Sequence, residues 1–194
     1  MASKAERRWA LWLGAAIMLV TTLPYLVGYF VQTVDLRYSG LVLAEEDGYS
    51  YLAKMLWGAG GAWLFKTPYT LAPQNGFLGF LPYLLLGKLT APPGQYVQLV
   101  ALFHLFRIAG GILVCLATYD FVSVFVEPIA WRRLATLVAM LGGGLGWLSV
   151  LGLGWLWRGP MPLEFYSPET FGFLGILAIP HLAWARALLL WGLR

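Results

Sequence analysis

The sequence carries little charge, since only 11% of its 194 residues are Asp, Glu, Lys or Arg. A water-soluble domain needs roughly 25% charged residues to cover its surface, so the low charge excludes an ordinary soluble domain. Cysteine is also scarce: Cys115 is the single one, so the chain forms no intrachain disulfide. Its apolar surroundings argue against a reactive thiol.

Histidine is nearly absent as well, with two residues in the chain. No second His or Cys stands at a metal-ligand spacing from His181, so the sequence predicts no metal site and no cofactor. The basic residues do not gather on a solvated, aromatic-bearing face, and this excludes nucleic acid as a partner.

Hydrophobic residues are abundant instead, at 60% of the chain, and they form several apolar runs. A run of about 20 residues is long enough to cross a hydrocarbon core of ~30 Å as a helix. The sequence therefore predicts an all-α integral membrane protein of one domain, 1–194, with about four transmembrane helices. The predicted spans are 9–34, 97–126, 134–157 and 171–193, separated on the outer side by extracytoplasmic loops at 35–96 and 158–170.

Basic residues flank these runs and set the predicted orientation. Arg7 and Arg8 precede the first span, and Arg132 and Arg133 precede the third. Because cytoplasmic loops carry an excess of Lys and Arg, we expect a multi-pass protein of the cell membrane with a cytoplasmic N-terminus. The segment 76–89 is too short to span and contains a proline, so we expect interfacial helices within the first extracytoplasmic loop.

A glycine-rich run, Gly142-Gly143-Gly144-Leu145-Gly146, lies inside the third predicted span. A phosphate-binding loop would follow a strand and include a Lys and a hydroxyl residue, and this run has none of these. We therefore expect the glycines to allow close packing of helices.

The segment Glu46-Asp47-Gly48-Tyr49-Ser50-Tyr51 is the most distinctive polar motif. At the start of a short helix over 44–56, its carboxylates meet the positive end of the helix dipole. On that helix Asp47, Tyr51 and Lys54 share one face. Two interpretations follow: helix capping on a solvated loop, or a catalytic carboxylate.

Other polar residues lie at the membrane segments. Glu169 stands at the entrance of the fourth span, where it is either a helix N-terminal acid or a second carboxylate that positions an acceptor. Arg107 lies within an apolar span, where a charge is expensive unless it is paired or faces a cavity. It is a candidate for binding a lipid phosphate, and the alternative is snorkelling to the interface. A lone His such as His181 is more often a hydrogen-bonded packing residue.

This arrangement resembles the amino-terminal part of the GT-C superfamily of polyprenyl-phosphate-sugar glycosyltransferases, which includes protein O-mannosyltransferases and lipid A aminoarabinose transferases. In that family the first outer loop begins with an Asp-Glu-x-x-Tyr-like motif, whose acid is the proposed base. Glu46-Asp47-Gly48-Tyr49 fits it in type, with the acids in reverse order, and Glu169 matches the place of a second acid, usually Asp. We therefore predict a site that combines catalytic carboxylates with substrate-binding residues: Asp47, Glu46 and Glu169 for the first role, and Arg107, Tyr49, Tyr51, Lys54 and His181 for the second.

The resemblance implies sugar transfer from a polyprenyl-phosphate donor at the extracytoplasmic face, with a lipid-linked sugar and membrane lipids as partners. Such enzymes generally have more spans and several hundred residues, so we expect a fragment of a longer protein or a shortened relative. The alternative function is a non-catalytic accessory or scaffold subunit that packs with other membrane subunits. A channel or transporter is a third interpretation, but the sequence lacks the broken-helix pairs and internal repeat of such folds.

Overall fold

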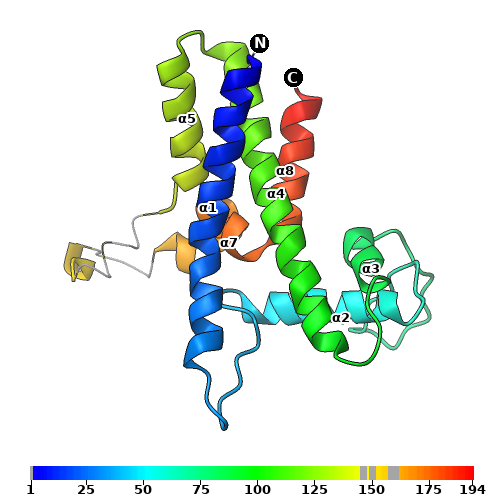
Figure 1. Ribbon diagram of the computed structural model, residues 1–194. Helices are drawn as coiled ribbons and strands as arrows, with labels where there is room; N and C mark the ends of the chain where they lie inside the picture. The colour runs from blue at the N-terminus through cyan, green and yellow to red at the C-terminus, as the bar shows by residue number, and fades with distance from the viewer. Residues whose placement is uncertain (1, 145–147, 149–151, 157–161) are drawn as a thin grey trace. The chain divides into compact units, whose positions relative to one another are not determined.

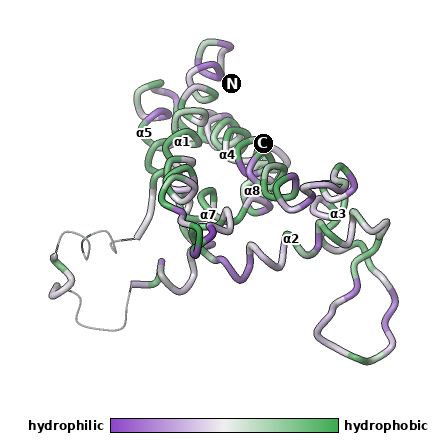
Figure 2. Tube along the Cα trace, turned by 60° about the horizontal axis from the view of Figure 1, so that its bottom comes forward, coloured by the Kyte–Doolittle hydropathy of each residue, from purple (hydrophilic) through white to green (hydrophobic). Residues whose placement is uncertain are grey.

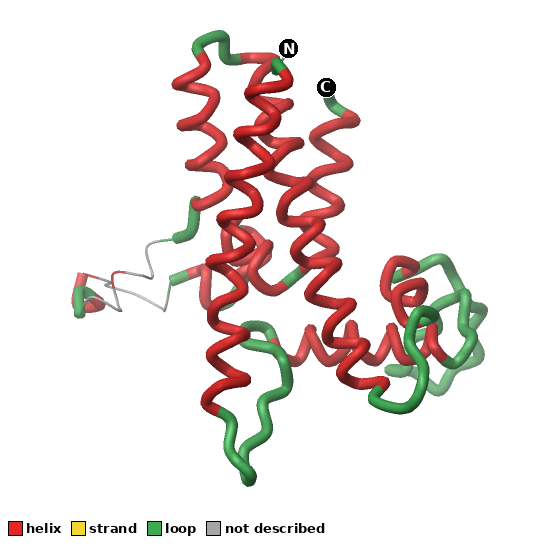
Figure 3. The backbone as a smooth tube through the Cα atoms, viewed as in Figure 1, coloured by secondary structure: helices red, strands yellow, loops and turns green. Residues whose placement is uncertain are grey.

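The computed structural model describes residues 2–144, 148, 152–156 and 162–194. It divides into two compact units, one formed by Met1–Val31 with Arg107–Arg194 and the other by Gln32–Phe106. Helices connected by loops make up the described residues, and none of these residues lies in a strand (Figure 3). The all-α prediction is therefore confirmed for this part of the chain.

Two helices, α1 and α4, are long and apolar enough to cross a membrane. Helix α1 extends over Lys4–Val31 and α4 over Gln95–Phe125, at the places of the predicted spans 9–34 and 97–126 (Figure 1). Proline is the strongest helix breaker. Helix α4 contains none, which accounts for its length. Helix α1 continues through Pro24, which helices in a membrane tolerate.

The third predicted span, 134–157, is not one continuous helix. Helix α5 begins earlier, at Ile129, and ends at Leu141, and the glycines 142–144 that follow are not helical. Each glycine costs about 1 kcal/mol relative to alanine inside a helix, so a run of three stops the helix. The prediction that these three glycines pack helices together is wrong for this reason; Leu145 and Gly146 lie outside the described residues.

The fourth predicted span, 171–193, consists of two helices. Helix α7 extends over Gly172–Ala178 and α8 over Pro180–Gly192. Ile179 separates them with φ −121° and ψ 81°. Pro180 is the cause, because a proline disfavours the α conformation of the residue before it.

The first unit buries several polar side chains beside its hydrophobic core and exposes large apolar ones. Thr21, Arg107 and Asp120 are at most 2% exposed, whereas Trp12 and Leu19 are 67% and 68% exposed. Figure 2 shows the hydrophobic colour along much of α1 and α4. Helix α1 thus exposes large apolar side chains that a soluble protein would mostly bury.

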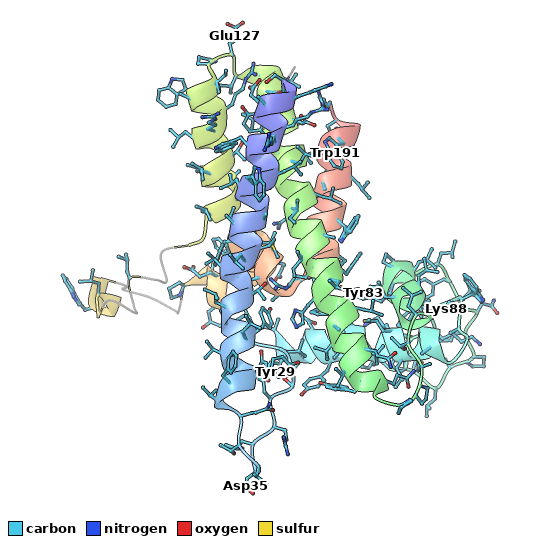
Figure 4. All side chains as sticks on the ribbon, in the orientation of Figure 1. Tyr29, Asp35, Tyr83, Lys88, Glu127 and Trp191 are labelled. Carbon is cyan, nitrogen blue, oxygen red and sulfur yellow. The ribbon has the colours of Figure 1, made fainter. Side chains whose placement is uncertain are left out.

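Ion pairs and a hydrogen bond connect α1, α4, α5 and α8 at the end of this unit where the two termini and the α4–α5 turn lie (Figure 1). Asp120 on α4 accepts from Arg7 at 2.9 Å and from the indole N–H of Trp191 at 3.2 Å, and it forms an ion pair with Arg194 at 3.1 Å. Glu6 on α1 pairs with Arg132 on α5 at 2.9 Å and accepts from the Tyr119 hydroxyl at 2.8 Å. Trp191 and Glu127, which follows α4, are labelled at this end in Figure 4.

The second unit is built on α2, Glu45–Ala59, which confirms the helix expected at 44–56, and on α3, Leu81–Gly87. The two helices pack closely through glycines. A Cβ atom on Gly87 would lie 1.6 Å from the Met55 carbonyl oxygen, and one on Gly58 would lie 1.9 Å from that of Leu84. Neither position has room for a side chain.

Replacing Gly87 by alanine should therefore separate α2 from α3. Overpacking of this kind typically costs about 1–3 kcal/mol, and a backbone atom on the opposing side cannot rotate away. We expect Gly87→Ala to lower the unfolding temperature of the purified protein. Gly60→Ala is the matched control, since Gly60 has φ −72° and its nearest neighbouring atom would lie 3.4 Å from a Cβ. Equal melting of Gly87→Ala and the wild type would contradict the packing.

Candidate functional site

The acidic motif lies at the first turn of α2, where Glu45, Glu46 and Asp47 are all exposed. The residue before the helix is Ala44, which has no side-chain oxygen to cap it. Within the described residues, the Asp47 carboxylate accepts no hydrogen bond and forms no ion pair. The negative charges of these acids therefore interact favourably with the positive, N-terminal end of the α2 dipole. The Asp47 carboxylate remains available to a ligand.

Lys54 follows two turns later on the same face of α2 and is only 8% exposed. Its ammonium donates to the Ser50 carbonyl at 3.3 Å and to the Ser50 hydroxyl. The Nζ atom lies 4.3 Å from the ring centre of Phe80 and 5.6 Å from that of Phe65. Burial lowers the pKa of the Lys54 ammonium, and the negative charge of Asp47 opposes this fall.

Tyr51 extends this aromatic cluster. It stacks on Tyr83 of α3 with 4.8 Å between the ring centres, and its ring centre lies 5.3 Å from Lys54 Nζ. Figure 4 labels Tyr83 on α3. Tyr49 is 48% exposed. Of the two predicted tyrosines, Tyr51 is thus a buried packing residue and Tyr49 is accessible.

A cavity of about 70 Å³ opens beside Lys54 within the second unit. One face of α2 lines it with Ser50, Lys54 and Trp57, and the following loop contributes Phe65 and Tyr69. Binding pockets typically combine apolar and aromatic walls with a few polar groups. Asp47 precedes Ser50 by three residues and Lys54 by seven, so it lies on the helix face that leads to this cavity.

Arg107 belongs to the other unit and is completely buried. Its guanidinium donates to the hydroxyls of Thr21 at 3.0 Å and Thr22 at 2.8 Å, and it lies 4.6 Å from the ring centre of Tyr25. These three partners are on α1. The contacts support a role in holding α1 to α4, and binding of a phosphate by Arg107 stays a prediction.

Glu169 and His181 lie in the same unit as Arg107. Glu169 is exposed in a single helical turn, Pro168–Thr170, and its main-chain carbonyl accepts from Arg186 of α8. His181 is half-buried at the start of α8, after Pro180. The predicted carboxylates are thus divided between the units, Glu46 and Asp47 in one and Glu169 in the other.

Comparison of the chain with family models, curated proteins and solved structures finds no match. The function is therefore inferred from the residues and their geometry. Among the described residues there is no group of three or more His, Cys, Asp or Glu side chains that could hold a metal ion. The expectation that no metal or cofactor is bound stays a prediction.

Arg186 is a candidate binding residue that the sequence analysis did not assign. It lines a second cavity, of about 200 Å³, within the first unit. The sequence did contain a signal for Arg186, namely a charged residue inside an apolar run. Such a charge is costly unless it is paired or faces a cavity. The same reasoning selected Arg107 from the sequence. In the structure the Arg107 guanidinium donates to two hydroxyls of the protein, those of Thr21 and Thr22.

Proposed function

We propose that the chain is an integral membrane protein whose first unit lies in the bilayer. The large apolar side chains exposed on α1 support this, since Trp12, Leu19 and Val20 suit a hydrocarbon solvent. Buried Arg107 and Asp120 have partners inside the unit, as intramembrane charges require. The N-terminus lies on the cytoplasmic side, with Arg132 and Arg133 near the start of α5.

In this proposal the chain crosses the membrane about four times, so that 35–96 and 158–170 are both extracytoplasmic. The variants Ser50→Cys and Ser167→Cys, made in a Cys115→Ala background, should both react with a membrane-impermeant maleimide from outside intact cells. The cytoplasmic controls are Ala2→Cys and Glu127→Cys, which should react only after the membrane is opened. Labelling of only one of the two outer positions would contradict the topology.

We further infer that the protein transfers a sugar from a polyprenyl-phosphate donor to an acceptor at the extracytoplasmic face. The observation that carries this proposal is the exposed Asp47 carboxylate on the helix face that leads to the aromatic cavity beside Lys54. The apolar C–H faces of a sugar ring pack favourably on rings such as Trp57 and Tyr69. Asp47 would act as the base.

In the proposed reaction the acceptor oxygen or nitrogen attacks the anomeric carbon of the donor. The bond between that carbon and the phosphate oxygen breaks, and the electron pair leaves with the polyprenyl phosphate. Asp47 takes the proton that the acceptor loses, which is general-base catalysis. Transfer of label from a polyprenyl-phosphate sugar, compared between the wild type and Asp47→Asn, tests the proposal.

A further inference from the structure

Lys54 of α2 is a buried lysine, and lysine is almost never fully buried unless it is paired. Among the described residues it forms no ion pair with a carboxylate. The rings of Phe80, Tyr51 and Phe65 surround its Nζ atom and attract the ammonium. Burial nevertheless lowers the pKa of Lys54 against the opposing charge of Asp47, which enlarges the fraction of neutral amine. A buried lysine of this kind is typical of a general base.

The Ser50 side chain is the group that the Lys54 amine reaches. The two residues are four positions apart on α2, so their side chains lie on one face of the helix. Lys54 Nζ lies 2.5 Å from the Ser50 hydroxyl oxygen and 3.3 Å from the Ser50 main-chain oxygen. A base must lie within hydrogen-bond reach of the proton that it takes. The neutral Lys54 amine meets this condition, because its lone pair can accept the hydroxyl proton.

Both side chains line the cavity of about 70 Å³ in the second unit. Ser50 is half-buried there, and Trp57, Phe65 and Tyr69 supply aromatic walls. An apolar cavity of about 150 Å³ holds benzene, so this smaller one has room for a short acyl group. Among the described residues that line it there is no carboxylate. The cavity therefore suits an uncharged substrate.

We propose that Ser50 and Lys54 form a nucleophile and base pair that cleaves an ester of a short acyl group. A serine hydroxyl is a weak nucleophile until an adjacent base takes its proton. The proposal is carried by the contact between the two side chains and by the cavity onto which both open. It is a second activity, and it does not depend on the sugar transfer assigned to Asp47.

In the first step Ser50 Oγ attacks the carbonyl carbon of the ester, and its proton passes to Lys54 Nζ. The bond between that carbon and the alcohol oxygen then breaks, and the electron pair leaves with the oxygen. The Lys54 ammonium returns the proton to the departing alcohol. The acyl group stays on Ser50 until water attacks it, again with Lys54 taking the proton, and the carboxylic acid is released.

A fluorophosphonate with a short alkyl group tests this in the full chain in detergent, because an activated serine displaces its fluoride and stays labelled. Peptide mass spectrometry should find the label on Ser50, and Ser50→Ala should remove it. Lys54→Arg keeps the positive charge, but a guanidinium is not deprotonated in proteins. We expect it to slow labelling by about 10²-fold or more, the contribution of a general base. Hydrolysis of p-nitrophenyl acetate should fall in the same variants.

Ser39→Ala and Lys66→Arg are the matched controls in the same unit and should be labelled like the wild type. The Ser39 hydroxyl accepts from the Leu41 amide at 3.3 Å, and Lys66 is exposed. Lys54→Met is a second variant that removes the base and suits the aromatic surroundings, and thermal unfolding checks that each variant is folded.

No label on Ser50 of the folded wild type would overturn the inference. Labelling of the folded Lys54→Met or Lys54→Arg protein at the wild-type rate would overturn it as well, because Lys54 would then not be the base. The probe needs no sugar donor, so a failure here leaves the proposed sugar transfer standing. Labelled Ser50 in a protein that transfers no sugar would support this inference alone.

Discussion

Replacing Asp47 by asparagine should lower the turnover of sugar transfer by about 10²- to 10⁴-fold, the usual contribution of a general base. The amide has nearly the size of the carboxylate but cannot take the acceptor's proton. Asp47 is exposed and forms no hydrogen bond or ion pair with the described residues, so the fold should be unaffected. Initial rates with a labelled polyprenyl-phosphate sugar measure the effect, and thermal unfolding checks the fold.

The neighbouring acids provide matched controls on the same helical turn. Glu45→Gln removes the same charge from the same dipole and should leave turnover close to that of the wild type. Glu46→Gln distinguishes between the two acids of the motif, because the resemblance allows either to be the base. A large loss in Glu46→Gln with normal turnover in Asp47→Asn would move the role to Glu46.

Replacing Asp120 by alanine should destabilise the first unit by about 3 kcal/mol. Removing one partner of a buried ion pair typically costs about 3–5 kcal/mol, and the lower end applies because the Arg7 side chain is 44% exposed and regains water. Arg194, at 19% exposed, and the Trp191 indole lose their shared acceptor. The free energy of unfolding in mixed detergent micelles measures this loss.

Asp35→Ala is the control for the Asp120 variant. It removes the same charge from an exposed loop residue and should change stability by less than about 0.5 kcal/mol. Combining Asp120→Ala with Arg194→Met should cost less than the sum of the two single changes, because both remove the same interaction. Additive losses would show that Asp120 and Arg194 do not interact.

Long apolar runs made α1 and α4 predictable from sequence, because length and hydropathy alone define such helices. The breaks after Leu141 and at Ile179 depend on local backbone chemistry that a hydropathy window averages out. The start of α2 was also predictable, since the carboxylates of Glu46 and Asp47 suit the first turn of a helix.

The partners of these residues were not predictable in the same way. Phe65 and Phe80, which surround the Lys54 ammonium, come from beyond the end of α2. Asp120 and Arg7 are 113 residues apart in the chain. Helical spacing describes neighbours on one helix and carries no information about such distant pairs. The partners of Arg107 on α1 escaped the sequence analysis for this reason.

The accessory-subunit alternative differs from the enzyme proposal in its expected results. A scaffold would transfer no sugar and would respond to substitutions at packing positions such as Gly87 rather than at Asp47. Its exposed apolar surface on α1 would then be covered by other membrane subunits. Co-purification with a larger membrane assembly, without any transfer, is the result that favours it.

The most direct test of the central claim is transfer by the wild-type chain in proteoliposomes. The assay supplies a polyprenyl-phosphate donor labelled in its sugar, with extracted membranes as the source of acceptor. The enzyme proposal predicts time-dependent movement of label to the acceptor and release of polyprenyl phosphate, both abolished or strongly reduced in Asp47→Asn. No movement of label with correctly folded wild-type protein, or equal transfer by the wild type and Asp47→Asn, would contradict it.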